Sequence, residues 1–490
     1  MLQSIRFVRE YPLAEQLTPD LCVIGAGAAG LSIAAAAATL GVPVVLVEKG
    51  RLGGEHLYTG CVPSKAMIAA GRRAEALRTA VPFGVRSAKP TVEFDEVNDH
   101  IHRVINAIAP NDSKERFTGL GVRVIEGEAR FLDSKTVVIG PELDIKFQIK
   151  ARRFVIATGS RPIVPVVPGI EQVPFLTNEN AFELRERPKH LIVLGGGPIG
   201  MELAQAFRRL GSEVTVLDMA QPLGKEDPEC SAIVLDAFAR EGITIRSGVK
   251  VERVRRLRQR IEVLLAGDTE ESIQGTDLLV AIGRRPNIDA LDLAAARIKH
   301  EPHGIVVNKR FGTSNRRVYA IGDVTGLPAF THSASHQAAL LIRHLLFRLP
   351  IKMNVDEIPR VTFTDPELAH VGLTDVQARE RHGSIRVLRW PYHDNERAQT
   401  ERETRGHIKV VTSTKGMILG ATIVGAVASE QITAWTLAIN HGLNIRAFAE
   451  IVMPYPTYTE IGKRAAITFF MPRLTTNWVR RILNLLRWFG

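Results

Sequence analysis

One glycine-rich pattern occurs twice in this chain of 490 residues, and it restricts the fold more than any other feature. The first copy begins LCVIGAGAAG at Leu21, and the second begins LIVLGGGPIG at Leu191. Each copy runs from a short apolar stretch through Gly-x-Gly-x-x-Gly and a helix-forming stretch to a second apolar run that ends in an acid. A duplicated β-α-β unit of this kind predicts an α/β chain with two Rossmann-like domains.

The spacing within each copy is that of a dinucleotide site. The first glycine and the acid are 23 residues apart in both copies. The first glycine makes a tight turn, the second lets backbone approach a pyrophosphate, and the third lets the helix pack on the strand. The helix N-terminus favours the phosphate charge, and the acid accepts hydrogen bonds from a ribose. The residues are Gly25, Gly27, Gly30 and Glu48 in the first copy, and Gly195, Gly197, Gly200 and Asp218 in the second.

Composition indicates an ordinary globular chain of about three domains, with 23% charged and 45% hydrophobic residues. The three cysteines (Cys22, Cys61 and Cys230) include no CxxC pair, so we expect no metal site and a reducing, cytoplasmic environment. The first twenty residues hold no uninterrupted apolar run, and no segment approaches the roughly 18 apolar residues of a membrane span. Neither a signal peptide nor a transmembrane helix is expected.

The net charge of +11 raises the question of an anionic partner. One basic run, KVERVRRLRQR from Lys250, alternates with apolar residues and predicts a solvated hairpin. No nucleic-acid motif accompanies the charge, so we predict no nucleic-acid partner.

The segment GGEHLYTGCVPSK, from Gly53 to Lys65, resembles the redox-active segment of the flavoprotein disulfide reductases, or class I pyridine nucleotide-disulfide oxidoreductases. This family includes lipoamide dehydrogenase, glutathione reductase and mercuric reductase. Its pattern is roughly GG-x-C-x4-C-x-P-S-K, and its two cysteines form a disulfide beside the flavin. Here the second cysteine is Cys61, but the first is His56, so this disulfide cannot form within the segment.

The resemblance covers about residues 20–470 and implies the domain order. An FAD-binding domain is expected over 1–155, an NAD(P)-binding domain over 156–285 and a second FAD part over 286–350. A C-terminal α+β domain over 351–470 would form a homodimer and complete each active site in trans. The expected cofactors are FAD and NADH. Asp218 suits a free ribose hydroxyl and repels a 2′-phosphate, which favours NADH. Lys225 and nearby arginines could bind a 2′-phosphate, so NADPH is the alternative nucleotide.

Three further segments carry the resemblance: ATGSRP from Ala157, AIGRRPN from Ala281 and YAIGDV from Tyr319. The first two resemble the turns that close each nucleotide domain. In the third, Asp323 is placed to accept hydrogen bonds from the ribityl chain. Besides the glycines and acids above, the expected cofactor contacts are Lys49, Gly54, Ala129, Thr158, Gly159, Ser160, Gly283, Gly322, Asp323 and, at the flavin edge, His332.

Four residues form the expected chemical centre. The resemblance implies an ion pair between Lys65 and Glu202 beside flavin N5, with the positive end supporting negative charge on the reduced flavin. Cys61 precedes a predicted helix whose dipole, together with Lys65, favours the thiolate form of its side chain. The alternative interpretation is that Cys61 is only a small buried hydrophobic residue. His56 is either a proton donor or a residue of the pocket wall.

The motif MPYPTYTE, from Met453 to Glu460, departs from the family as well. In lipoamide dehydrogenase and glutathione reductase this region reads H-x-H-P-T-x-x-E, with the second histidine as acid/base and the glutamate orienting it. Here Glu460 is present and Tyr455 occupies the base position. A tyrosine is a poor general base at neutral pH. Thiol and base are thus altered together, which argues against a thiol or disulfide substrate.

The last twenty residues, 471–490, form a basic amphipathic tail. They carry Arg473, Arg480, Arg481 and Arg487 and no acid. Apolar positions recur at helical spacing, with Arg480, Arg481, Asn484 and Arg487 on the other face. One interpretation is a helix packed on the dimer. The other is an interfacial helix at the inner face of the membrane.

We therefore expect an FAD-dependent oxidoreductase that passes hydride from NADH to flavin and then to a small non-dithiol acceptor such as a quinone. A divergent mercuric reductase or dihydrolipoamide dehydrogenase-type enzyme is the alternative. Tyr455 and the motif GCVPSK resemble mercuric reductase. The C-terminal segment LLRWFG, however, lacks the adjacent cysteines that pass mercury to the active site in that enzyme. A flavin-binding protein with a sensing or scaffolding role is the third interpretation.

Overall fold

The computed structural model describes residues 14–86, 90–141, 144–267, 271–474 and 476–489. Most of the N-terminal stretch for which no signal peptide is expected lies outside these residues. Within the described ranges, no helix combines the length and the apolar character needed to cross a bilayer.

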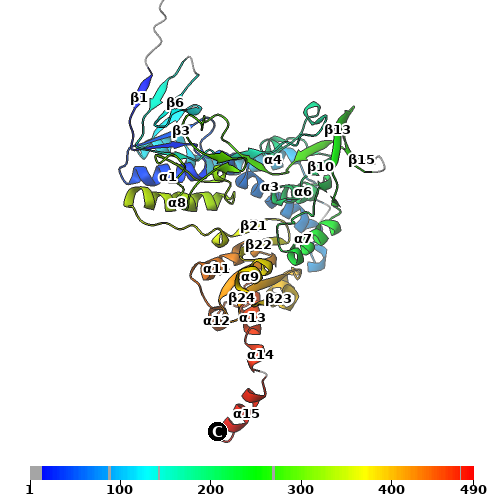
Figure 1. Ribbon diagram of the computed structural model, residues 1–490. Helices are drawn as coiled ribbons and strands as arrows, with labels where there is room; N and C mark the ends of the chain where they lie inside the picture. Colours follow the sequence, from blue (N-terminus) through cyan, green and yellow to red (C-terminus); the bar gives the residue numbers. More distant parts are fainter. Residues whose placement is uncertain (1–13, 87–89, 142–143, 268–270, 475, 490) are drawn as a thin grey trace, which may run out of the picture.

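The first glycine-rich copy forms the middle of a five-stranded parallel sheet. Its apolar runs are the central strands β2 and β3, which are almost wholly buried because helices cover the sheet. Helices α1 and α8 pack together on one face (Figure 1). The strand order is β20 (Val318–Ala320), β8 (Arg153–Ile156), β2 (Leu21–Ile24), β3 (Val44–Glu48) and β4 (Arg123–Glu126).

The chain leaves this sheet for a second one and then returns. Strand β20 lies some 160 residues beyond β8, yet Val318 pairs with Phe154 in parallel register. The long α8 follows β20 and brings Thr331 back over the first glycine-rich unit. Helices of this part are α1 (Ala28–Thr39), α2 (Gly54–Tyr58), α3 (Cys61–Arg78), α4 (Phe94–Ile108), α5 (Lys114–Gly119) and α8 (Thr331–Phe347). A four-stranded sheet beside them contains β1 (Glu15–Leu17), β7 (Phe147–Ile149), β6 (Thr136–Ile139) and β5 (Ala129–Asp133).

The second copy builds a four-stranded parallel sheet. Its order is β12 (Thr244–Ser247), β11 (Glu213–Asp218), β10 (His190–Leu194) and β16 (Asp277–Val280), with α6 (Pro198–Arg209) and α7 (Pro228–Arg240). An antiparallel sheet of β13 (Val251–Leu257), β14 (Arg260–Leu265) and β15 (Glu271–Gly275) extends from it. The arginines of β13 are exposed, which confirms the predicted solvated hairpin. The short β9 (Ser160–Pro162) pairs with β17 (Arg284–Pro286), and β18 (His300–Glu301) with β19 (Gly304–Ile305).

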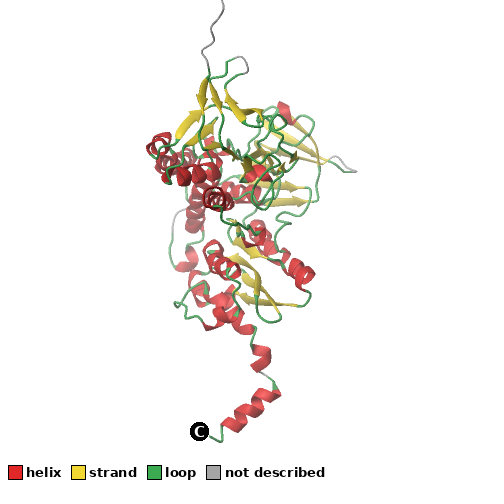
Figure 2. Cartoon of the chain, turned by 60° about the vertical axis from the view of Figure 1, so that its left-hand side comes forward, coloured by secondary structure: helices red, strands yellow, loops and turns green. Residues whose placement is uncertain are grey.

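The third part is an antiparallel five-stranded sheet with helices, so the predicted α/β plus α+β fold is confirmed (Figure 2). Its order is β21 (Arg360–Thr362), β22 (Glu367–Gly372), β25 (Ile418–Gly425), β24 (His407–Ser413) and β23 (Ile385–Pro391). Its helices are α9 (Asp375–His382), α10 (Glu396–Glu401), α11 (Ala428–Asn440), α12 (Arg446–Glu450) and α13 (Glu460–Thr468). Beyond them, α14 (Met471–Leu474) and α15 (Asn477–Leu486) extend away from the body (Figure 1).

Candidate active site

The two glycine-rich turns have the same geometry. Gly25 and Gly195 adopt φ of 101° and 104°, values that side chains other than glycine rarely reach. A Cβ on Gly30 would lie 1.8 Å from the Gly25 carbonyl oxygen, and one on Gly200 would lie 2.0 Å from that of Gly195. The first glycine therefore makes the turn, and the third permits the contact between helix and strand.

The second glycine of each copy faces open space. A Cβ on Gly27 or Gly197 would meet no protein atom within 4 Å, and each residue directly precedes a helix N-terminus. The acids are held close by: a Glu48 oxygen accepts from Ala26 N at 2.6 Å. Likewise, an Asp218 oxygen accepts from Gly196 N at 2.5 Å. Open backbone at a helix N-terminus beside a fixed carboxylate fits the pyrophosphate and ribose of a dinucleotide.

Two adjoining cavities, of about 490 Å³ and 570 Å³, lie along the first unit, and both are lined by Gly27, Glu55, Thr59 and Ala157. Their continuity fits an elongated ligand such as FAD. Of the expected residues, the first cavity is lined by Gly27, His56, Cys61, Lys65, Gly159, Glu202, Gly322, Asp323 and His332. The second cavity is lined by Gly25, Gly27, Glu48, Lys49, Gly54, Ala129, Thr158 and Ser160.

The other expected residues line neither cavity. Gly30 is enclosed by its own turn, and the second-copy residues Gly195, Gly197, Gly200 and Asp218, with Gly283, belong to the other nucleotide unit. That unit reaches the first cavity through Pro198 and Ile199 at the start of α6. A nucleotide bound at the second turn would therefore point toward the first cavity.

Lys65 and Glu202 form the expected ion pair in the wall of the first cavity. Their Nζ and Oε2 atoms are 2.7 Å apart, and Glu202 is buried. The other carboxylate oxygen accepts from the backbone N of Phe363 at 2.9 Å, and the Lys65 Nζ lies 4.4 Å from the Phe363 ring centroid. The third part of the chain thus holds the pair in place.

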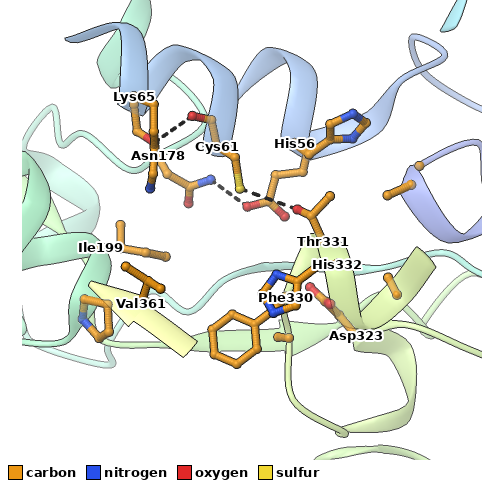
Figure 3. A pocket seen from close by; sticks show the side chains of 18 of the residues that line it. His56, Cys61, Lys65, Asn178, Ile199, Asp323, Phe330, Thr331, His332 and Val361 are labelled. Carbon is orange, nitrogen blue, oxygen red and sulfur yellow. Dashed lines mark hydrogen bonds between the residues drawn. The ribbon is translucent and has the colours of Figure 1, made fainter. Parts of the chain in front are cut away.

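Cys61 is the first residue of α3, and its sulfur is exposed to the first cavity. Figure 3 shows the sulfur pointing toward Thr331, whose Oγ1 lies 3.4 Å away. Cys22 lies buried in β2, and Cys230 lies buried in α7 with its sulfur 3.6 Å from His407 Nε2. All three cysteines are free, and Cys61 is exposed, so the alternative of a small buried hydrophobe at this position is wrong.

His56 lies on α2, and its ring is placed to the side of Cys61 opposite Lys65 (Figure 3). Its Nε2 is 3.5 Å from an Asp112 oxygen, and within the described residues its buried Nδ1 has no hydrogen-bond partner. Burial lowers the pKa of His56, and Asp112 opposes that shift. Burial of the ring therefore favours the neutral imidazole.

Sequence reasoning missed a polar cluster between the two cavities. Glu55 is paired with Arg284 and accepts from the Asn178 amide at 3.1 Å. Burial raises the pKa of Glu55 to about 7, Asp323 and Glu179 add to the rise, and Arg284 opposes it. Glu55 belongs to the motif GGEHLYTGC and Arg284 to the motif AIGRRPN, both of which are visible in the sequence. Because 229 positions separate the two residues, the sequence gives no signal that they pair.

Tyr455 and Glu460 line neither of the two cavities of their own chain. Tyr455 is 68% exposed on the third part, and Glu460 begins α13. The neighbouring Ile451 and Val452 are exposed as well, at 49% and 90%. His332 does line the first cavity, stacked on Phe330 with its Nε2 2.8 Å from the Pro359 carbonyl oxygen.

Comparison with known proteins agrees with this geometry. Residues 19–338 match the pyridine nucleotide-disulphide oxidoreductases, and residues 358–466 match the dimerisation domain of the same proteins. A mercuric reductase from Lysinibacillus sphaericus is 34% identical over 473 residues, which cover 96% of this chain and 86% of the reductase. A dihydrolipoyl dehydrogenase from Bacillus subtilis is 35% identical over 453 residues, which cover 91% and 95% of the two chains.

Among solved structures, the HOCl-induced flavoprotein disulfide reductase RclA from Escherichia coli, in its Cu(II) complex, is similar with a TM-score of 0.82. The two share 26% identity, over 92% of this chain and 99% of RclA. The dimerisation domain indicates a homodimer. The chain therefore belongs to the pyridine nucleotide-disulphide oxidoreductase family, and it is an FAD-dependent oxidoreductase that uses a nicotinamide nucleotide.

Proposed function

We propose that this enzyme oxidises NADH and delivers the electrons to a small acceptor that is not a dithiol, with a quinone as the acceptor class. One observation carries the proposal: the Cys61 sulfur faces the cavity with a threonine hydroxyl, not a second sulfur, as its neighbour. The chain holds two other cysteines, and both are buried elsewhere. A dithiol exchange needs two sulfurs within bonding distance.

The second nucleotide unit supplies the donor side. Asp218 is fixed by Gly196 N and by Ala220 N at 2.7 Å, so its carboxylate is set to receive a ribose diol and to repel a 2′-phosphate. This favours NADH, although the exposed Lys225 stands in the loop that follows. FAD, when bound, supplies the two-electron carrier between nucleotide and acceptor.

The protein would then stabilise negative charge in the first cavity. The Lys65 ammonium, held by Glu202 and by the Phe363 ring, offers a fixed positive charge to a cofactor that becomes anionic when reduced. Elsewhere in the first cavity, Phe330 and Val361 provide apolar surface (Figure 3). Such a surface suits a flat, uncharged acceptor.

We further propose that the homodimer completes the site. Tyr455 and Glu460 lie on an exposed face that includes Ile451 and Val452, which suits burial against a second copy. Tyr455 would then line the partner's cavity, where its phenol can donate a hydrogen bond but cannot serve as a base at neutral pH.

An anaerobic titration with NADH, followed by visible absorbance, tests the proposal. One equivalent per FAD should bleach the flavin completely, since no second two-electron centre accompanies it. A requirement for two equivalents, with a long-wavelength intermediate after the first, would overturn the non-dithiol assignment. Turnover with a soluble quinone should exceed turnover with oxygen; equal rates would remove the quinone.

A second candidate is reduction of a thiol-bound or thiophilic substrate. The exposed Cys61 sulfur and the similarity to mercuric reductases favour it. In that case Cys61→Ala abolishes substrate turnover and leaves dye reduction by NADH intact. Under the quinone proposal, both activities survive the substitution.

A further inference from the structure

The C-terminal helix α15 carries an apolar face that nothing in the described chain covers. None of its residues is buried, and it stands clear of the body (Figures 1 and 2). Trp478 is 69% exposed, Leu485 62%, Trp488 89% and Phe489 82%. Large apolar side chains gathered in this way mark an interaction surface, because a free chain would lower its energy by burying them.

The helix separates apolar from basic side chains. At 100° per residue, Trp478, Ile482, Leu485 and Phe489 fall within one stripe, as the sequence predicts. Arg480 and Arg487 lie on the opposite side, and Arg481 flanks the stripe. A helix with tryptophans and leucines on one face and arginines on the other suits the boundary between headgroups and acyl chains.

The positive charge of the tail indicates that an anionic surface would bind this helix. Residues 471–490 contain four arginines and no acid. The ordered helix spans Asn477–Leu486, about 15 Å at 1.5 Å per residue, which is half the thickness of a bilayer core. It can therefore lie along a membrane but cannot cross it.

We propose that residues 477–489 are an interfacial anchor that binds anionic lipid bilayers, with the apolar stripe inserted among the headgroups and the arginines facing lipid phosphates. The membrane proposal does not depend on the identity of the electron acceptor, so either proposal can be wrong while the other holds. Binding would place the enzyme beside lipid-soluble acceptors without altering the cavity itself.

Co-sedimentation of the FAD-loaded, full-length enzyme with vesicles tests the anchor. Vesicles of phosphatidylglycerol and phosphatidylcholine should retain the protein, whereas pure phosphatidylcholine should retain far less. The triple variant R480E/R481E/R487E should bind anionic vesicles at least about 100-fold more weakly, since each basic residue near such a surface contributes about fivefold. Trp478→Ser with Leu485→Ser should also weaken binding.

A matched control exists on the β13–β14 hairpin. The triple variant R253E/R258E/R260E makes the same change in net charge at exposed positions far from the tail in sequence, and it should bind as the parent does. Equal loss in the two triple variants would show a general charge effect and overturn the anchor. Equal retention of the full chain and of a chain ending at Phe470 would overturn it too. A tail variant that instead loses dimer mass by light scattering would assign the helix to the second copy.

Discussion

Two neighbouring sites on α3, one helical turn apart in the wall of the first cavity, differ in how many of the family's residues they keep. At Lys65, an ion pair of 2.7 Å, a buried carboxylate and an adjacent aromatic ring hold a positive charge in place. At Cys61, a single sulfur faces Thr331, and His56 stands where the family pattern has a second sulfur. In the proposed function the Lys65 site serves reduction of the flavin, and the Cys61 site is the one that dithiol exchange would use.

We propose that the two half-reactions use different parts of the chain. The donor half would depend on α3, α6 and the loop around Phe363, which pack together. The acceptor half could then differ from that of the family without loss of the donor half. Four substitutions test the roles assigned to individual residues.

The largest effect is expected at Lys65. Lys65→Met removes the fixed charge and leaves the Glu202 carboxylate buried without its partner. Loss of one preorganised electrostatic group typically costs a factor of about 100–1,000. The rate of flavin reduction by NADH, measured by stopped-flow absorbance, should fall by that amount. Lys114→Met, which removes an exposed lysine that is paired with Glu126 and lines neither cavity, should leave the rate unchanged; equal rates in both variants would contradict the role of Lys65.

Asp218 should control the choice of nucleotide. Asp218→Asn keeps the shape and one acceptor but removes the charge, and hydrogen bonds to charged groups are stronger by roughly 1–1.5 kcal/mol. The ratio of kcat/KM for NADH to that for NADPH should therefore fall about tenfold. Glu48→Gln makes the matching change in the first copy, where it should weaken FAD retention and leave this ratio alone. An unchanged ratio in Asp218→Asn would show that another residue selects the nucleotide.

Glu55 should make stability depend on pH. Its pKa of about 7 in the folded state lies above the ordinary 4.5, so the folded protein binds the extra proton between these values. The stabilisation is full below about pH 4.5 and is lost as pH rises through 7. In Glu55→Gln the fall in the free energy of unfolding of the FAD-free protein over this range should be smaller.

Urea unfolding at several pH values checks this expectation. Glu126→Gln, at an exposed carboxylate paired with Lys114, serves as the control and should keep the parent's pH dependence. A Glu55→Gln variant with the parent's slope would mean that the carboxyl titrates normally in the folded chain.

The smallest effect is expected at Cys61. Cys61→Ala should change NADH-to-quinone turnover by less than about threefold, because no bond to sulfur forms in the proposed reaction. Thr331→Val, which removes the hydroxyl beside the sulfur, is its companion. Loss of turnover in Cys61→Ala alone would place the sulfur in the reaction and return the enzyme to thiol chemistry.

Much of the site was predictable because its determinants are local. The glycine turns at Gly25 and Gly195, the acids Glu48 and Asp218, and the start of a helix near Cys61 follow from short-range sterics and hydrogen bonds. The ion pair of Lys65 with Glu202 was also expected, but through family resemblance. No spacing rule joins residues 137 positions apart.

The sequence by itself determined three features: the duplicated nucleotide units, the absence of a second sulfur in the redox segment, and the amphipathic tail. Each unit, segment or tail is defined by residues that are close together in the chain. Only the tertiary structure decided that Glu55 meets Arg284, that Phe363 holds Glu202, and that Thr331 faces Cys61. It also placed Tyr455 on an exposed face, where it lines neither cavity of its own chain. These contacts join segments that are far apart in the sequence. They form only when whole domains pack together, because the burial of apolar surface is non-directional and depends on the complete core.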